Sequence, residues 1–442
     1  MPASSRKPVD LVIASPWIVP VVPRDSLLTD HAIAISEQRI VDIAPAADIA
    51  EKYQPKESVQ LDNHVLMPGM VNAHGHSPMA LFRGIADDIP LMQWLEERIW
   101  PLEGQHVSTE FVRDGTLLAM AEMIRGGTTC FADMYFFPDE VAKAATETHI
   151  RVQLASPVLD FPTVWAQDAG EYISKATQLH DDYRSSELVY TAFGPHAPYT
   201  VSDEPLRKIA VLADELDVPI HIHMHEAAQE IEDALAKDGR RPLQRMQQLG
   251  IVSPRLLCVH ATQLNHKEMQ LLAETGASVI HCPSSNLKLA SGFCEVEKLR
   301  KQGVNVALGT DGAASNNDLD MFGEMQLAAL VAKAVAQDAS ALPAAAALET
   351  ATINGAKAMG LDNDLGSLEP GKYADIAAVS MEALSSLPVN NPLSHLVYAS
   401  GATDVTDVWC GGKNLLRNRE LQTLDLAYIR QRSQHWQQMF SH

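Results

Sequence analysis

The chain has 442 residues and a formal net charge of −22. This acidity argues against binding to a nucleic-acid backbone, which requires a basic surface, and we attribute the charge to solubility. A content of 46% hydrophobic and 20% charged residues is typical of a folded globular protein and excludes a disordered chain. At this length we expect one large α/β barrel with a smaller appendage, or two domains.

No segment of the sequence suggests export or a membrane span. Residues 1–8 are polar and lack the apolar stretch of a signal peptide, so we expect a cytoplasmic protein without a membrane or nucleic-acid partner. The most apolar region, residues 327–348, is interrupted by Lys333, Asp338 and Pro343, which predicts two packed helices. Five irregularly spaced cysteines without a C-x-x-C pair are expected to be reduced and buried.

Both ends of the chain have the pattern of short β-strands. Between residues 9 and 65, apolar and polar residues alternate in runs broken by Pro and Asp, which predicts a small antiparallel sheet. A similar pattern returns at residues 366–379 and 405–413. We therefore expect a small β-sandwich domain formed from both termini, residues 1–65 plus 366–442, with a helix at the carboxyl end.

The central region, residues 66–365, alternates apolar strands with helical stretches such as 111–125 and 206–215. This alternation is typical of parallel β/α architecture. The predicted strands end near His76, Asp133, Ser156, His196, His223, His260, His281 and Asp311. Eight such units predict an α/β fold of the distorted (β/α)8 TIM-type barrel, although a doubly wound sheet has the same local pattern.

Histidine and aspartate gather at the predicted carboxyl ends of these strands, where a barrel of this kind has its active site. His74 and His76 are two residues apart, so on a strand both imidazoles point to one face. His196, His260 and Asp311 end three further strands. A single such residue is more often structural, but their recurrence at one level of the barrel predicts a metal site.

The implied ligands are two histidines of the first strand, one histidine of the fifth strand and the aspartate of the eighth. Parity leaves the fifth-strand ligand open, because positions 221, 223 and 225 share one face. Glu226 lies just past the strand end, three residues after His223, and this spacing favours His223 as the ligand. Three imidazoles and a carboxylate suit Zn²⁺, with Fe²⁺, Ni²⁺ or Mn²⁺ as alternatives.

With these motifs the chain resembles the amidohydrolase superfamily and, within it, the deaminases of 5′-methylthioadenosine and S-adenosylhomocysteine. The resemblance covers nearly the whole chain and is carried by five segments: LMPGMVNAHGH at 66–76, GPHAPY at 194–199, HMHE at 223–226, HCPSSNLKL at 281–289 and GTDGAASN at 309–316.

The resemblance implies a role for seven residues. It identifies His74, His76, His223 and Asp311 as ligands of one divalent metal per chain. It places Glu103, His196, Glu226 and Asp311 against a small-molecule nucleoside, and relatives commonly form homo-oligomers. An arginine that some members use to hold the nucleoside is not evident at the end of the third strand, where the sequence is Ala155-Ser156-Pro157. Binuclear members carry a carboxylated lysine or an acidic residue at the end of strand four, whereas this chain has Gly194-Pro195-His196.

These residue types suit the hydrolytic deamination of adenine. A metal lowers the pKa of bound water toward neutrality, so that hydroxide can attack C6. Asp311 is expected to accept the proton of the water, Glu226 to protonate N1 of the ring, and His260 to orient the hydroxide. Glu103 alone has the sequence of a solvated helix cap, but the resemblance implies that it binds the ribose, since a carboxylate can accept two hydrogen bonds from a vicinal diol.

Two other functions remain open at this point. The same site could deaminate or dechlorinate another purine or an s-triazine, such as guanine, adenosine or an ammeline-type compound, although Glu103 favours a ribosyl substrate. A non-catalytic scaffold of amidohydrolase type is the alternative from a different class. Such a scaffold would be expected to have lost metal ligands, whereas this sequence has a complete set.

Overall fold

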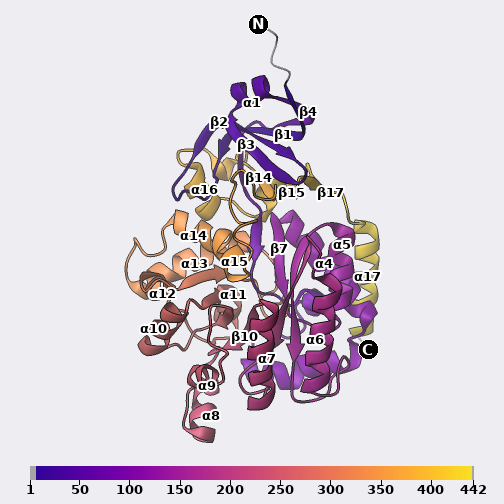
Figure 1. Ribbon diagram of the computed structural model, residues 1–442, viewed down its shortest axis with the longest axis vertical. Helices are drawn as coiled ribbons and strands as arrows, with labels where there is room; N and C mark the ends of the chain where they lie inside the picture. The colour runs from indigo at the N-terminus through magenta and orange to yellow at the C-terminus, as the bar shows by residue number, and fades with distance from the viewer. Residues whose placement is uncertain (1–5, 441–442) are drawn as a thin grey trace.

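The computed structural model describes residues 6–440, which form a parallel barrel and a separate mixed sheet (Figure 1). The barrel strands pair in the order β13 (Asn305–Leu308), β12 (Ser278–His281), β11 (Leu256–His260), β10 (Ile220–Met224), β9 (Val189–Pro195), β8 (Arg151–Val158), β7 (Thr128–Asp133) and β6 (Met70–Asn72). Every neighbouring pair is parallel. The amide of Ala73 donates to the carbonyl of Leu308 at 2.9 Å and joins the first strand to the last. The predicted barrel is confirmed.

The strand ends lie within a few residues of the predicted positions. β6 ends at Asn72 and β13 ends at Leu308, so His74, His76 and Asp311 lie in the loops that directly follow these strands. Strands β7 and β8 are buried along their whole length, because the barrel interior covers one face and helices cover the other. The strands are therefore held rigidly behind the loops that carry the polar residues.

Helices surround the barrel and follow most of its strands. They are α4 (Thr109–Arg125), α5 (Pro138–Thr148), α6 (Ala169–Tyr183), α7 (Asp203–Leu216), α8 (Ala228–Asp238), α9 (Pro242–Gln248), α10 (His266–Thr275), α11 (Pro283–Lys288), α12 (Val296–Lys301), α13 (Met321–Ala336), α14 (Ala344–Thr350) and α15 (Ile353–Ala358). The two helices predicted for the most apolar region are confirmed as α13 and α14. No helix within residues 6–440 is both long and apolar enough to cross a membrane.

Both ends of the chain contribute to one nine-stranded sheet, as the sequence predicts. Its order is β17 (Glu420–Leu421), β16 (Lys413–Arg417), β15 (Val405–Cys410), β14 (Ile376–Ser380), β5 (His64–Pro68), β1 (Lys7–Ile18), β2 (Leu28–Ser36) and β3 (Arg39–Pro45), with β4 (Tyr53–Gln60) also paired to β1. The expectation of a purely antiparallel sheet is wrong, because β1 runs parallel to both β4 and β5. Helix α1 (Ala46–Lys52), between β3 and β4, reverses the chain and makes the parallel pairing with β4 possible.

Two contacts tie the ends of the chain to the barrel. The carboxyl-terminal helix α17 (Leu426–Phe440) lies along α4, and the indole of Trp436 donates to Asp114 at 2.8 Å. Arg151 of β8 is fully buried and pairs with Asp375 at 3.0 Å, just before β14.

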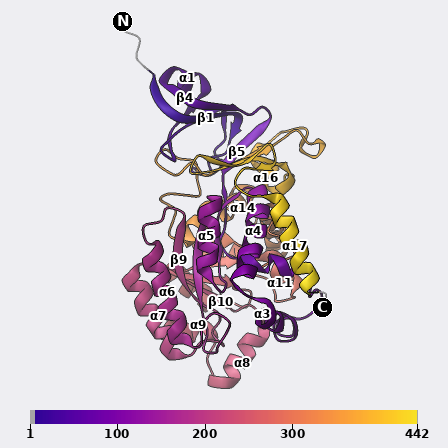
Figure 2. The same ribbon diagram turned by 90° about the vertical axis from the view of Figure 1, so that its right-hand side faces the viewer.

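All five cysteines are buried and unpaired, as the sequence predicts. The terminal sheet lies at one end of the molecule, and helices α3 (Trp100–His106) and α8 lie at the other (Figure 2).

Candidate metal centre and active site

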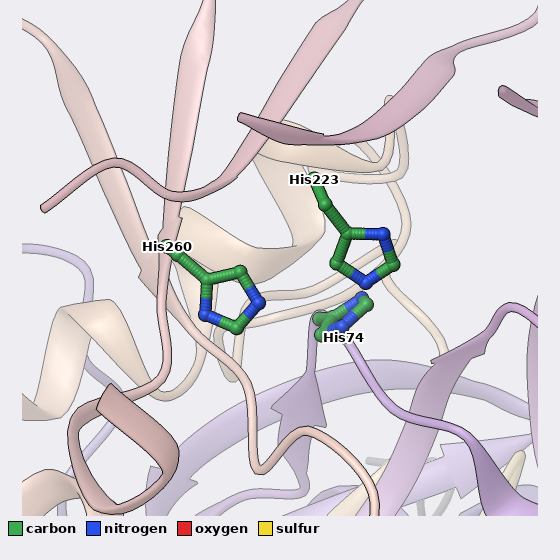
Figure 3. Close-up of side chains that lie close together, drawn as sticks. All are labelled: His74, His223 and His260. Atoms are coloured by element: carbon green, nitrogen blue, oxygen red, sulfur yellow. The ribbon is translucent and has the colours of Figure 1, made fainter. Parts of the chain in front are cut away.

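Histidines from three strand ends point toward one another in the barrel. His74 follows β6, His223 lies on β10 and His260 ends β11, and their rings converge on one point (Figure 3). One nitrogen from each ring lies within 4.8 Å of the others, and His74, His76 and Asp311 form a second group that meets the same limit. The two groups share His74, so both surround a single region at the carboxyl ends of the strands.

Hydrogen bonds fix the orientation of two of these imidazoles. Nδ1 of His76 donates to the carbonyl of Met134 at 2.6 Å, and Nδ1 of His223 donates to the carbonyl of His196 at 2.7 Å. Because a carbonyl can only accept, Nδ1 carries the hydrogen in both rings and Nε2 of a neutral ring carries a lone pair. Both Nε2 atoms are therefore prepared to bind a cation.

His74 and Asp311 complete the arrangement. Oδ1 of Asp311 lies 3.3 Å from Nε2 of His74 and 3.2 Å from Nε2 of His76. Nε2 of His74 is buried without a hydrogen-bond partner, and burial lowers the pKa of His74 to about 4. The lone pair of the neutral His74 ring and the Asp311 carboxylate repel each other at this distance. The same carboxylate overcomes burial and raises the pKa of His76 to about 9, so the cluster favours a positive charge between its members. These residues therefore fit a divalent metal ion.

The carboxylate of Asp311 is held from several sides. Its Oδ2 accepts hydrogen bonds from the hydroxyls of Ser285 at 2.6 Å and Ser315 at 2.8 Å. Burial raises the pKa of the Asp311 carboxyl group, but its close contacts with the rings of His74 and His76 outweigh this and hold its pKa well below the usual range. Asp311 is therefore ionised, as a metal ligand must be.

Close backbone packing brings the end of β13 against the loop after β6. A Cβ atom at Gly309 would lie 2.7 Å from Cβ of His74, closer than real Cβ atoms approach other atoms. Glycine at this position therefore lets Asp311, two residues later, reach the imidazoles of His74 and His76. The amide of Asp311 also donates to the carbonyl of His74 at 3.1 Å.

His260 and Glu226 lie next to each other beside the metal ligands. Nδ1 of His260 donates to Oδ1 of Asn286 at 2.9 Å, and its Nε2 lies 3.6 Å from Oε2 of Glu226. Burial raises the pKa of Glu226 above its usual value. A carboxylic acid of this kind can donate a proton to a substrate.

The other two histidines of this region have supporting positions. Nε2 of His221 lies 2.9 Å from Nδ1 of His74, so His221 holds the ring of a candidate ligand. His225 is turned away: its Nε2 accepts from the amide of Leu243 at 3.1 Å, and it has a positive φ of 55°. The sequence leaves positions 221, 223 and 225 equivalent, and the structure brings only His223 into the shared cluster with His74 and His260.

A cavity of about 100 Å³ adjoins this cluster, and the remaining predicted site residues line it. His196, Glu103, Glu226 and Asp311 all line it. Glu103 belongs to α3, and burial raises its pKa to about 7. The side chain of Tyr135, which lines the same cavity, lies beside the Glu103 carboxylate and lowers its pKa against the effect of burial. The cavity therefore offers polar groups to a ligand at two places, at the cluster and at α3.

Sequence reasoning missed several supporting residues of the site. Ser285 and Ser315 orient Asp311, and Asn286 orients His260. Ser285 and Asn286 belong to the HCPSSNLKL segment, so the segment was visible but the role of each residue in it was not. Tyr135 carries no signal in the sequence, because it follows β7 in a loop without any periodic pattern.

An eight-stranded parallel barrel with imidazoles and a carboxylate converging at its carboxyl end defines a barrel hydrolase of the metal-dependent class. Residues 65–415 match the Amidohydrolase family. The chain belongs to this family.

Similar proteins cover almost the whole chain. A protein of Saccharophagus degradans named 5-methylthioadenosine/S-adenosylhomocysteine deaminase is 52% identical over 98% of this chain and 97% of its own length. A protein of Methanothermobacter thermautotrophicus named 5′-deoxyadenosine deaminase is 40% identical over 90% and 92%. A crystal structure of an adenosine deaminase from Xanthomonas campestris with bound zinc is 49% identical, covers 98% and 99%, and has a TM-score of 0.97. The atrazine chlorohydrolase TrzN of Arthrobacter aurescens shares the fold at 22% identity and a TM-score of 0.90 over 96% and 99%.

Proposed function

We propose that this protein is a metal-dependent hydrolase that deaminates the adenine ring of 5′-methylthioadenosine, S-adenosylhomocysteine or both. The reaction consumes water and releases ammonia and the corresponding inosine analogue. The observation that carries the proposal is the convergence of His74, His76, His223 and Asp311 beside the buried acid Glu226. The names of the relatives at 52% and 40% identity support the choice of an adenine nucleoside.

The metal site of the proposal uses the nitrogen and oxygen atoms described above. His74, His76, His223 and Asp311 would hold one divalent ion per chain, and a set of three imidazoles and one carboxylate suits Zn²⁺. The zinc-bound Xanthomonas structure supports this choice of metal. When bound, the ion would lower the pKa of a water molecule toward neutrality and so provide the nucleophile.

The residues around the metal site divide the proton transfers between them. Asp311, which is ionised, accepts a proton from the attacking water and later passes it to the departing ammonia. Glu226, whose pKa is raised, donates a proton to N1 of the purine as C6 is attacked. His260 is held by Asn286 at the edge of the cluster and orients the attacking water.

The nucleoside is positioned by residues at the other side of the cavity. Glu103 accepts hydrogen bonds from the two ribose hydroxyls, because a carboxylate offers two acceptor oxygens to a vicinal diol. His196 lines the cavity between Glu103 and the cluster and contacts the purine. Its pKa is lowered to about 4 by burial, so its ring is neutral at pH 7 and can hydrogen-bond a ring nitrogen.

One assay tests the proposal directly. The zinc-loaded protein is incubated with 5′-methylthioadenosine, S-adenosylhomocysteine, adenosine, guanine and an s-triazine, and ammonia release is measured. We expect release from adenine nucleosides and none from guanine or the triazine, since Glu103 has no diol to bind in the last two. Activity on guanine or the triazine without activity on any adenine nucleoside would contradict the proposed substrate class.

A further inference from the structure

A second cavity, of about 240 Å³, adjoins the cavity above the metal centre. The two share the lining residues Trp100, Glu103, Phe136, Leu159 and His196. Glu226 lines the first cavity and not the second. The second cavity is therefore reached past Glu103, the predicted ribose contact, and lies away from the acid that protonates the base.

The lining of the second cavity is mostly apolar, and its polar members are Glu103, Thr163 and His196. Phe161, Pro162 and Val164 of the loop after β8 form one side, and Trp100 and Phe136 form another. The hydroxyl of Thr163 is already hydrogen-bonded to that of Tyr172 at 2.6 Å. No residue that lines this cavity is a lysine or an arginine, and its one carboxylate is Glu103.

Two large apolar side chains of this loop are left open to solvent. Phe161 is 41% exposed and Val164 is 45% exposed, and both line the same cavity. Exposed apolar groups that gather at one hollow commonly mark a ligand site, because an apolar ligand group removes them from water. The exposed side chains of Phe161 and Val164 therefore indicate that an apolar ligand group binds in this cavity.

The chemistry of the nucleoside determines which of its groups reaches this cavity. N1 lies in the six-membered ring of the purine, whereas the ribose is attached to the five-membered ring at the other end of the base. A nucleoside with N1 at Glu226 and its diol at Glu103 therefore directs its 5′ substituent away from Glu226. A third cavity, of about 490 Å³, is lined by charged residues that include Lys237 and Arg240, but it adjoins Glu226. The third cavity shares no lining residue with the second, so these cations do not line the second cavity.

We propose that the second cavity is the subsite for the 5′ substituent and that it selects an uncharged thioether or alkyl group over a charged amino-acid tail. This inference rests on the proposed function and narrows its substrate. A methylthio group covers Phe161 and Val164 and places its sulfur beside aromatic rings. The homocysteine tail carries an ammonium and a carboxylate, and in this cavity its carboxylate would meet Glu103 and apolar side chains but no cation, which disfavours it.

The first test compares kcat/KM of the zinc-loaded enzyme for four nucleosides that differ only at the 5′ position: 5′-methylthioadenosine, 5′-deoxyadenosine, adenosine and S-adenosylhomocysteine. We expect 5′-methylthioadenosine to exceed S-adenosylhomocysteine by about 100-fold and adenosine by about 10-fold. Equal or higher kcat/KM for S-adenosylhomocysteine overturns the subsite alone. If none of the four releases ammonia, the proposed function itself is overturned.

The second test introduces a cation into the subsite. Val164→Arg adds a guanidinium to an exposed loop position, so the fold is unaffected, and we expect the ratio of kcat/KM for S-adenosylhomocysteine to that for 5′-methylthioadenosine to rise at least about 10-fold. The matched control is Val211→Arg on α7, where Val211 is 56% exposed and lines none of the three cavities. An unchanged ratio in Val164→Arg, or the same rise in Val211→Arg, overturns the proposal.

Discussion

The two sides of the candidate active site are built differently. On the metal side, His74, His223 and Asp311 are buried, and hydrogen bonds to neighbouring atoms fix each ring or carboxylate. On the α3 side, Glu103 is only partly buried and Phe161 is 41% exposed. The difference suggests that the reaction depends on groups locked to the barrel, whereas substrate choice depends on loop residues that can vary without disturbing it.

Removal of a metal ligand should have the largest effect. The His196 carbonyl holds the His223 ring so that its neutral Nε2 can bind the metal, and His223→Ala removes this ligand. We therefore expect kcat to fall at least about 10,000-fold and the metal content to drop. Metal analysis of the unmodified protein should give one equivalent per chain, against well below one for the variant.

The control for this prediction is His266→Ala, an exposed histidine at the start of α10 that should keep both metal and activity. Two tightly held metal equivalents in the unmodified protein would contradict a mononuclear site. Full activity of His223→Ala would remove His223 from the metal centre.

Glu226→Gln should have a smaller effect, because it leaves the metal ligands in place. Glutamine can hydrogen-bond N1 of the purine but cannot transfer a proton to it, so we expect kcat to fall about 1,000-fold with KM nearly unchanged. Steady-state kinetics and metal analysis are measured together. Glu232→Gln, an exposed position on α8, is the matched control. A fall in metal content equal to the fall in kcat would assign Glu226 to the metal instead.

The barrel and its metal side could be predicted from the sequence because periodic patterns encode them. Apolar strands that each lead into a polar residue place those residues at one end of the barrel. His74 and His76 converge as expected but lie in the loop after β6, not on the strand that their spacing of two predicts. The direction of a terminal strand is not encoded in this way. Apolar alternation has the same period in parallel and antiparallel sheets, so the pairing of β1 with β4 could not be read from residues 9–65.

The α3 side could not be predicted from pattern, because its residues come from irregular segments. Glu103 after Pro101-Leu102 has the sequence of an ordinary helix boundary, and only its resemblance to a family motif assigned it to the ribose. Phe161 and Val164 lie in a loop without periodicity, and their approach to Glu103 depends on how the loop after β8 folds over α3. The substrate tail is therefore the part of the function that required the structure.

The pH dependence of nucleoside binding tests the α3 side with the smallest expected effect. Burial raises the pKa of Glu103 from its ordinary value to about 7. Below that pH the group is protonated and loses acceptor capacity, so KM for 5′-methylthioadenosine should rise as the pH falls through about 7 and fall as the pH increases toward 8.

Glu103→Gln should raise KM about 10-fold at pH 8, because an amide has one acceptor oxygen, and should abolish the pH dependence near 7. The control Glu96→Gln, at an exposed position, should leave KM and its pH dependence unchanged.

The same measurements with 2′,3′-dideoxyadenosine, which lacks the diol, separate the two sides of the site: its KM should respond neither to Glu103→Gln nor to pH near 7. An equal response of both nucleosides would mean that Glu103 acts on the base or on the metal side rather than on the ribose.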